Sequence, residues 1–179
     1  MKQRKTPNKT SKVAPDATKS KIRLSEDESS IDRPRRVKQP SKKTVKERAW
    51  YAFSQFIRTR DCLVTTGTPD RGKCITCGLE FPFKQLQAGH FIAGRHNANL
   101  FSEKGVHAQC RSCNIWKHGK PLEYRKAIID LYGDGYDEVL EREAREIKKY
   151  SVQDLTKLIE YYKIETDRLV RRYNDYLGR

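Results

Sequence analysis

The 179-residue sequence lacks any apolar run that approaches the roughly 20 residues needed to cross a bilayer. Its basic first residues are not followed by the apolar segment that forms the core of a signal peptide. The same segment has almost no large apolar residues at helical spacing, which disfavours an amphipathic membrane anchor. We therefore expect a cytoplasmic protein without a membrane partner.

Aromatic residues are missing from the first 48 positions, which contain no Phe, Trp or Tyr. These positions hold 16 Lys and Arg against 6 Asp and Glu, so they carry +10 of the net charge of +15. Such a segment buries too little apolar surface to offset the entropy lost on ordering, and we expect residues 1–44 to form a disordered basic tail. Its charge favours nucleic acid as a partner, and the alternative is a solubilising leader that binds nothing.

Cysteine is scarce and unevenly spaced. Four of the five cysteines form two C-x-x-C pairs, Cys74 with Cys77 and Cys110 with Cys113, while Cys62 stands alone. In a cytoplasmic protein this usage favours metal binding over disulfides. Two such turns supply a closed tetrahedral thiolate site, which leaves no position for water or substrate. We therefore expect a structural Zn²⁺ ion, and a buried or incidental thiol at Cys62.

Apolar periodicity predicts a helix before the cysteine pairs. It begins near Val45 and extends through Ile57, and residues 61–72 have the Gly and Pro content of a loop. Residues 73–118 are rich in turns, except that a helix is expected to begin just after Cys113.

Three further helices are expected towards the C-terminus, over residues 121–133, 136–149 and 151–177. The middle one is charged and is expected to turn Ile147 inward with its neighbouring apolar residues. The last one opens on a capping-box pattern at Ser151. Its aromatic stripe is expected to pack in the core rather than to stack on bases.

His90 lies between the two cysteine pairs, and Asn114 and His118 follow the second pair. If a helix begins at Cys113, Asn114 and His118 are four residues apart on one of its faces. An imidazole can accept a proton from water near neutral pH. A hard cation held opposite it can bind a phosphate, because substrate oxygens and water complete its ligand shell. These residue types can therefore supply the groups that phosphodiester hydrolysis requires.

The order C-x-x-C, His, Asn-Leu, C-x-x-C-Asn-x-x-x-His resembles that of the HNH nucleases, whose active site is a ββα-metal unit. A narrower similarity, to the NinG/Rap phage recombination proteins, is carried by GHF at 89–91, NANLF at 97–101, VHAQCRSCN at 106–114 and EYRKAIIDLYG at 123–133. Those proteins are an HNH-related family of structure-directed DNA endonucleases. The resemblance extends from about Cys74 to the C-terminal helix and leaves the tail uncovered.

The resemblance implies an α+β fold. Residues 45–133 would form a treble-clef or ββα-metal, HNH-like zinc-bound core with flanking helices, and residues 134–179 a C-terminal helical region. It also implies a metal-dependent DNA endonuclease that acts on branched recombination intermediates such as Holliday junctions, D-loops or flaps. A phage-encoded chain would act in the host cytoplasm with other phage recombination proteins, and as a homodimer if it makes two symmetric cuts.

The resemblance assigns roles to the three motif residues. His90 is the general base, His118 is a ligand of a catalytic Mg²⁺ or Mn²⁺ ion, and Asn114 is a ligand or orients the hairpin. Many HNH enzymes have an acidic metal ligand just before the base, where this chain has Gly89. Three other side chains are therefore candidates for recruitment to the metal: Gln87, His96 and His107. Five basic residues near the motif are candidates for contacts with DNA phosphates: Arg95, Arg111, Lys117, Lys120 and Arg125.

Three alternatives remain open. One is a non-catalytic, zinc-dependent nucleic-acid-binding protein, whose activities would survive the substitution His90→Ala. Another is a sequence-specific HNH homing or restriction nuclease, which would cut linear duplex at one sequence and ignore branched DNA. The third is a structural partner of a phage recombinase or polymerase that docks through residues 150–179.

Overall fold

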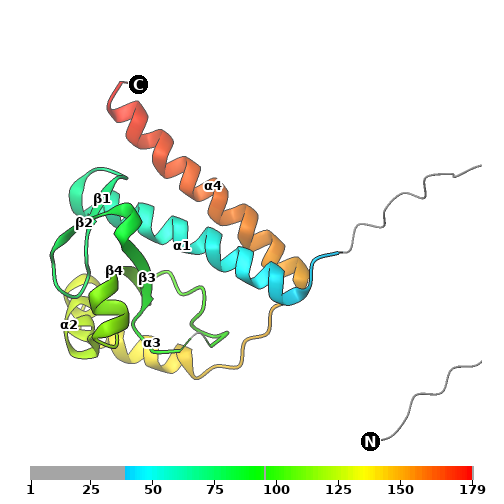
Figure 1. The fold of residues 1–179 in the computed structure, drawn as a ribbon. Coiled ribbons are helices and arrows are strands. Elements are labelled where there is room, and N and C mark those ends of the chain that lie inside the picture. The colour runs from blue at the N-terminus through cyan, green and yellow to red at the C-terminus, as the bar shows by residue number, and fades with distance from the viewer. Residues whose placement is uncertain (1–38, 95, 179) are drawn as a thin grey trace, which may run out of the picture. The chain divides into compact units, whose positions relative to one another are not determined.

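The structure, a computed structural model, describes residues 39–94 and 96–178 (Figure 1). The expected basic tail lies outside these residues, except for its last six positions. Lys42 to Thr44 already belong to the first helix, so that helix begins slightly earlier than Val45. Within the described residues, none of the helices combines the length and the apolar character that a bilayer span requires.

Helix α1, Lys42–Thr66, is the longest element in the first half of the chain. The Ser41 hydroxyl caps its start by accepting a hydrogen bond from the Thr44 N–H, and Gly67 ends it in the left-handed conformation at φ 70°. The prediction of a loop from residue 61 is wrong, because the buried face of the helix continues through Asp61 and Cys62. The thiol of Cys62 is fully buried, as expected.

Helix α4, Val152–Tyr176, lies alongside α1 (Figure 1, orange to red against cyan). Its start is confirmed: Ser151 and Asp154 form a reciprocal capping box. Tyr162 is buried among the α1 residues Phe53 and Phe56, so this part of the aromatic stripe packs in the core. At the end of the stripe the expected packing is wrong, because Tyr176 is exposed.

Two short antiparallel sheets lie between these helices in the sequence. Strands β1, Arg71–Lys73, and β2, Glu80–Pro82, flank the first cysteine pair, and a 3-10 turn, η1, covers Phe83–Gln85. Strands β3, Leu86–His90, and β4, Val106–Cys110, form a second hairpin in which Gly89 pairs with His107.

The two faces of the β3–β4 hairpin pack against different helices, because side chains alternate along a strand. Ala88 and Val106 belong to the core that contains α1, so this face is turned towards that helix. Gln87 and Gly89 lie on the opposite face, where Gln87 meets Asn114 and the Gly89 carbonyl accepts from the Tyr124 hydroxyl of helix α2, Pro121–Tyr132. The hairpin is therefore held from both sides.

The segment after the second cysteine pair departs from the expected helix. It is a single π-helical turn, η2, Ser112–Trp116, in which the Lys117 N–H donates to the Ser112 carbonyl at 2.9 Å. The turn ends before His118, whose φ of 49° is left-handed. The prediction that Asn114 and His118 share one face of a regular helix is therefore wrong.

Two helices complete the fold. Helix α2, Pro121–Tyr132, is followed by Gly133 and confirms the prediction for this segment. Helix α3, Tyr136–Ala144, ends five residues earlier than expected. Ile147, predicted to point inward, is 91% exposed because it lies beyond the end of α3. The observed class is α+β, with helices around two small sheets, as the sequence indicates.

Candidate metal centre and adjoining cleft

The four cysteines of the two C-x-x-C pairs come together in one cluster. Their Sγ atoms all lie within 4.8 Å of one another, and three of the four residues are buried. Cys110 ends β4 and Cys113 lies in η2, so the cluster joins the hairpin to the turn that follows it. Within the described residues it is the one group of three or more His, Cys, Asp or Glu side chains close enough to share an ion.

The pKa values of these thiols differ within the cluster. Burial alone would raise the pKa of Cys74, but hydrogen bonds from Thr76 and from nearby backbone N–H groups outweigh it and bring the pKa to about 7. Burial raises the pKa of Cys77 to about 12, and it also raises that of Cys110. Four thiolates so close together repel one another unless a cation is bound between them. The donor set, four sulfurs at C-x-x-C spacing, fits a structural Zn²⁺ ion.

His90, Asn114 and His118 line one cleft of about 420 Å³ beside this cluster. The three come from the end of β3, from η2 and from the turn after η2. The remaining lining residues are mainly small or apolar: Ala88, Phe91, Ala93, Gly94, Ile115, Gly119 and Pro121. The cleft therefore concentrates its chemistry in two imidazoles and one carboxamide.

The half-buried ring of His90 is held from two directions. Its Nε2 lies 3.4 Å from the Leu100 carbonyl oxygen. Its plane stacks on Trp50 of α1, with the ring centroids 5.0 Å apart and an interplanar angle of 16°. A carbonyl can only accept, so a hydrogen bond to Leu100 requires the proton on Nε2 and leaves the ring lone pair on Nδ1.

Asn114 is oriented by the hairpin. Its Nδ2 donates to Gln87 Oε1 at 2.9 Å, and its Oδ1 lies 3.0 Å from the position that a Cβ on Gly89 would take. Asn114 contacts the face of β3 on which Gly89 lies, whereas the His90 side chain lies on the other face, towards α1. Asn114 and His90 therefore reach the cleft from opposite faces of the strand.

Gln109 fills the space next to Gly89. Its Nε2 donates to the Gly119 carbonyl at 2.8 Å and to Thr76 Oγ1 at 3.2 Å, so it connects the first cysteine pair to the turn that carries His118. Its Oε1 is buried without a hydrogen-bond partner among the described residues. A Cβ on Gly89 would lie 2.1 Å from that oxygen. Gln109 thus occupies the space that an acidic side chain at position 89 would need.

His118 is exposed, and backbone hydrogen bonds to Cys113 and Ile115 close the base of the turn that carries it. The Gly119 N–H donates to the Cys113 carbonyl at 2.8 Å, and the His118 N–H donates to the Ile115 carbonyl at 3.3 Å. The cysteine cluster therefore fixes where the His118 backbone lies.

Of the candidates for recruitment to a metal, His107 lies in a buried network outside the residues that line the cleft. Its Nδ1 is 3.2 Å from Asp61 Oδ2 and 3.1 Å from Arg60 Nη2, and its Nε2 is 3.1 Å from the Tyr132 hydroxyl. A carboxylate only accepts hydrogen bonds and a guanidinium only donates them. Nδ1 therefore bonds Asp61 when it carries a proton and Arg60 when it does not. Gln87 bonds Asn114, and the exposed His96 lies over Gly94.

The candidate DNA contacts differ in how their charges are compensated. Lys120 pairs with Glu123, and Arg125 pairs with Asp137 and Glu141. Arg111 and Lys117 are exposed, and the Arg111 guanidinium lies 5.6 Å from the centroid of the Trp116 ring. Arg95 lies outside the described residues. The exposed charge next to the cleft is thus carried by Arg111 and Lys117.

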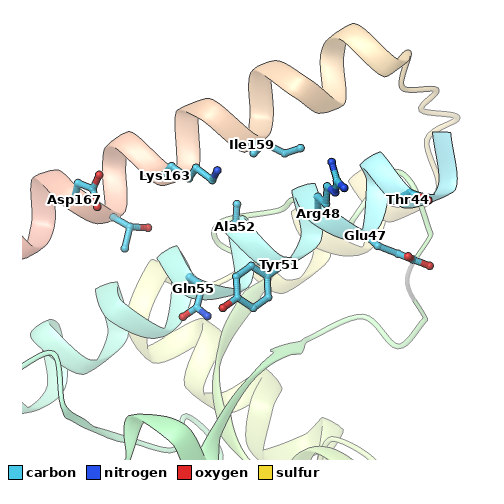
Figure 2. Close-up of a pocket in the computed structure, with 10 residues that line it drawn as sticks. Thr44, Glu47, Arg48, Tyr51, Ala52, Gln55, Ile159, Lys163 and Asp167 are labelled. Atoms are coloured by element: carbon cyan, nitrogen blue, oxygen red, sulfur yellow. The ribbon is translucent and has the colours of Figure 1, made fainter. Parts of the chain in front are cut away.

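A wider groove of about 780 Å³ runs between α1 and α4 (Figure 2). It is lined by Thr44, Glu47, Arg48, Tyr51, Ala52, Gln55, Ile159, Lys163, Thr166 and Asp167. Its lining contains no His or Cys, and its two acidic and two basic side chains include no cluster that could share an ion. The two histidines and the asparagine of the predicted motif therefore line the smaller cleft and not this groove.

These features define an α+β protein with a four-cysteine metal site. A family model described as "Bacteriophage Lambda NinG protein" matches residues 1–172, and the chain belongs to this family.

The chain is 34% identical over 95 residues to the protein named ninG of Escherichia phage 933W, a match that covers 52% of this chain and 43% of that protein. The match to the ninG protein of Escherichia phage lambda has the same identity and covers 52% and 42% of the two chains. For Salmonella phage P22 the identity is 34% over 88 residues, which are 49% of this chain and 39% of the relative. The chain thus spans about two fifths of the length of the curated relatives that it matches. No solved structure matches it significantly.

Proposed function

We propose that this chain is a metal-dependent DNA endonuclease that hydrolyses phosphodiesters, with β3, β4 and η2 acting as a ββα-metal unit of the HNH type. The observation that carries the proposal is the cleft in which His90, Asn114 and His118 meet beside the cysteine cluster. The substrate class, branched recombination intermediates, follows from the resemblance to the phage recombination nucleases.

His90 is the proton acceptor in this proposal. In the tautomer whose Nε2–H donates to the Leu100 carbonyl, Nδ1 is the nitrogen that would take the proton of the attacking water. Stacking on Trp50 limits rotation of the ring, which keeps the Nδ1 lone pair in one direction. As the water attacks, its proton passes to His90.

Asn114 and His118 would hold the catalytic cation. An amide oxygen and an imidazole nitrogen can bind Mg²⁺ or Mn²⁺ when water and phosphate oxygens complete the shell. Those additional oxygens are needed because no carboxylate lines the cleft. When bound, such an ion supplies charge stabilisation at the phosphate and at the leaving 3′ oxygen. Gln87 directs the Asn114 amide, and the cysteine cluster fixes the His118 turn.

The test is a cleavage assay on end-labelled four-way junctions, flaps and matched duplex, with Mg²⁺, Mn²⁺ or EDTA. We expect cleavage that requires the metal, and we expect His90→Ala to lower the rate by about 100-fold or more while DNA binding and zinc content persist. His96→Ala is the matched control, because His96 is exposed and does not line the cleft.

Each rival has its own outcome in this assay. Cleavage of linear duplex at one sequence, with branched DNA left intact, would support a homing or restriction nuclease. Tight DNA binding with no cleavage under any metal, unchanged in His90→Ala, would establish a non-catalytic zinc-dependent DNA-binding protein and overturn the proposal.

A further inference from the structure

Trp116 is a large aromatic side chain in an unusual position. It is one of two tryptophans in the sequence, and 67% of its surface is exposed. The other, Trp50, packs on Phe53 and His90. A tryptophan so exposed contributes little to the core, whereas its flat ring offers a large area for contact with a partner at a low cost in side-chain entropy.

The backbone holds Trp116 in a fixed place next to the cleft. It ends η2, whose Lys117 N–H donates to the Ser112 carbonyl and whose base includes Cys113 of the cysteine cluster. Ile115, directly before it, is 49% exposed and lines the cleft with His90 and His118. Trp116 is therefore the immediate neighbour in sequence of a cleft-lining residue, on a turn that includes Cys113 of the cysteine cluster.

The surroundings of the ring select the chemistry of its partner. The Arg111 guanidinium lies over the ring at 5.6 Å, and the exposed Lys117 follows it in the chain. An exposed aromatic ring with a guanidinium over one face and a lysine next in the chain matches a nucleobase joined to phosphates, because the base can stack on the ring while the cations contact the backbone. The same cations disfavour a basic or purely apolar protein surface.

We propose that Trp116 is a specificity-determining residue that stacks on a nucleobase at an interruption of the duplex, such as a branch, a nick or a single-stranded end. In continuous B-form DNA both faces of each base are stacked, so contact with Trp116 would require unstacking at a cost in free energy. At an interruption one face is already accessible, and stacking is gained without that cost. The inference rests on the proposed function in that the cleft beside the ring is where DNA is cut.

The experiment measures binding separately from cleavage. Full-length zinc-loaded protein is titrated, with Ca²⁺ in place of Mg²⁺, against a flap, a single-stranded overhang and a continuous duplex of the same sequence. Each carries 2-aminopurine at the same nucleotide, beside the interruption where there is one. We compare wild type with Trp116→Ala, Trp116→Phe and Tyr51→Ala. Tyr51 is a matched control, because it is 66% exposed and lines the α1–α4 groove instead of the cleft.

We expect Trp116→Ala to weaken binding to the flap and the overhang by about 5- to 100-fold and binding to continuous duplex by no more than about twofold. The 2-aminopurine fluorescence that stacking quenches in the wild type should remain unquenched in this variant. Trp116→Phe should retain most of the preference, and Tyr51→Ala should retain all of it. Retained zinc content in Trp116→Ala shows that the turn is intact.

Two results would overturn the inference. If Trp116→Ala weakens binding to flap and duplex equally, Trp116 is a general DNA contact. If it weakens binding to none of the DNAs, Trp116 does not contact DNA, and a protein partner becomes the explanation for its exposure. If wild type cuts nothing but the selective loss is seen, the proposed nuclease function fails and the stacking role stands. If wild type cuts DNA and Trp116→Ala keeps its substrate preference, the nuclease function stands and this inference fails.

Discussion

Gly89 and Gln109 carry no reacting group, yet they determine what can lie beside the reacting side chains. The space next to Gly89 is taken by the Gln109 carboxamide, which holds the Gly119 carbonyl and Thr76 in place. The absence of an acidic residue before His90 is thus compensated sterically by an amide from the neighbouring strand. An amide in this space keeps it neutral, so a metal in the cleft would depend more on water and phosphate oxygens.

We expect Gly89→Asp to lower the free energy of unfolding by about 1–3 kcal/mol, because its Cβ would collide with Gln109 Oε1. The measurement is urea denaturation of zinc-loaded protein. In the background of Gln109→Ala the same substitution should cost less, since the colliding group is gone. Strictly additive costs in this double-mutant cycle would show that the two side chains do not compete for the space.

The sequence predicts some of the residues around the cleft well and others not at all. Cys74, Cys77, Cys110 and Cys113 are identified by spacing alone, because a C-x-x-C turn places two sulfurs together locally. The contribution of Gln109 depends on its register opposite Gln87, and that of Trp50 on how α1 crosses the hairpin. Both are long-range packing relations that no short motif encodes.

At the scale of elements, the sequence predicts helices α2 and α4 correctly, and it does not predict the form of the turn between Cys113 and Pro121. Helices α2 and α4 carry clear terminal signals, Pro121 and the Ser151 capping box. The five residues of η2 are too few for a helical period to show in the sequence. Cys113 lies within this turn, and its sulfur is within 4.8 Å of the other three.

Asp61 connects α1 to the hairpin. Its buried carboxylate accepts from the Ala108 N–H at 2.6 Å and pairs with Arg60, and it lies against His107. Burial alone would raise the pKa of Asp61, but the hydrogen bond with His107 and the charge of Arg60 outweigh it and lower the pKa. One carboxylate therefore holds the end of α1 on β4.

We expect Asp61→Asn to destabilise the protein at neutral pH by about 1–3 kcal/mol. Because the folded-state pKa is lowered, the stabilisation by the carboxylate is complete above its ordinary pKa of about 3.9 and is lost as pH falls through the lowered value. The difference in unfolding free energy between wild type and variant should be constant from pH 7 to about 5 and shrink below about 4. Urea titrations of both proteins across this range measure it; a difference that grew with acidity would contradict this account.

For the molecule as a whole, the cysteine cluster is the point where separate parts of the chain are joined. It connects the β1–β2 turn, the end of β4 and η2, and through η2 it fixes the turn that carries His118. The described fold thus has two sources of stability, the apolar contacts between α1 and α4 and a metal site that organises the cleft.

We expect one tightly held Zn²⁺ ion per chain, and we expect its removal to lower the free energy of unfolding by about 5 kcal/mol or more. Plasma emission spectrometry measures the metal, and circular dichroism with and without chelator measures the stability. Cys113→Ala should lose the ion. Cys62→Ala, which removes a buried thiol outside the cluster, should keep it. Equal zinc content in both variants would show that Cys113 is dispensable for the site.

His118 and Lys120, on either side of Gly119, are the two non-glycine residues with positive φ in the described part of the chain. Each adopts a backbone conformation that costs an L-residue about 1–2 kcal/mol and costs glycine almost nothing. A chain selected for stability alone would place glycine at position 118. The imidazole there is consequently held against the conformational preference of its own backbone.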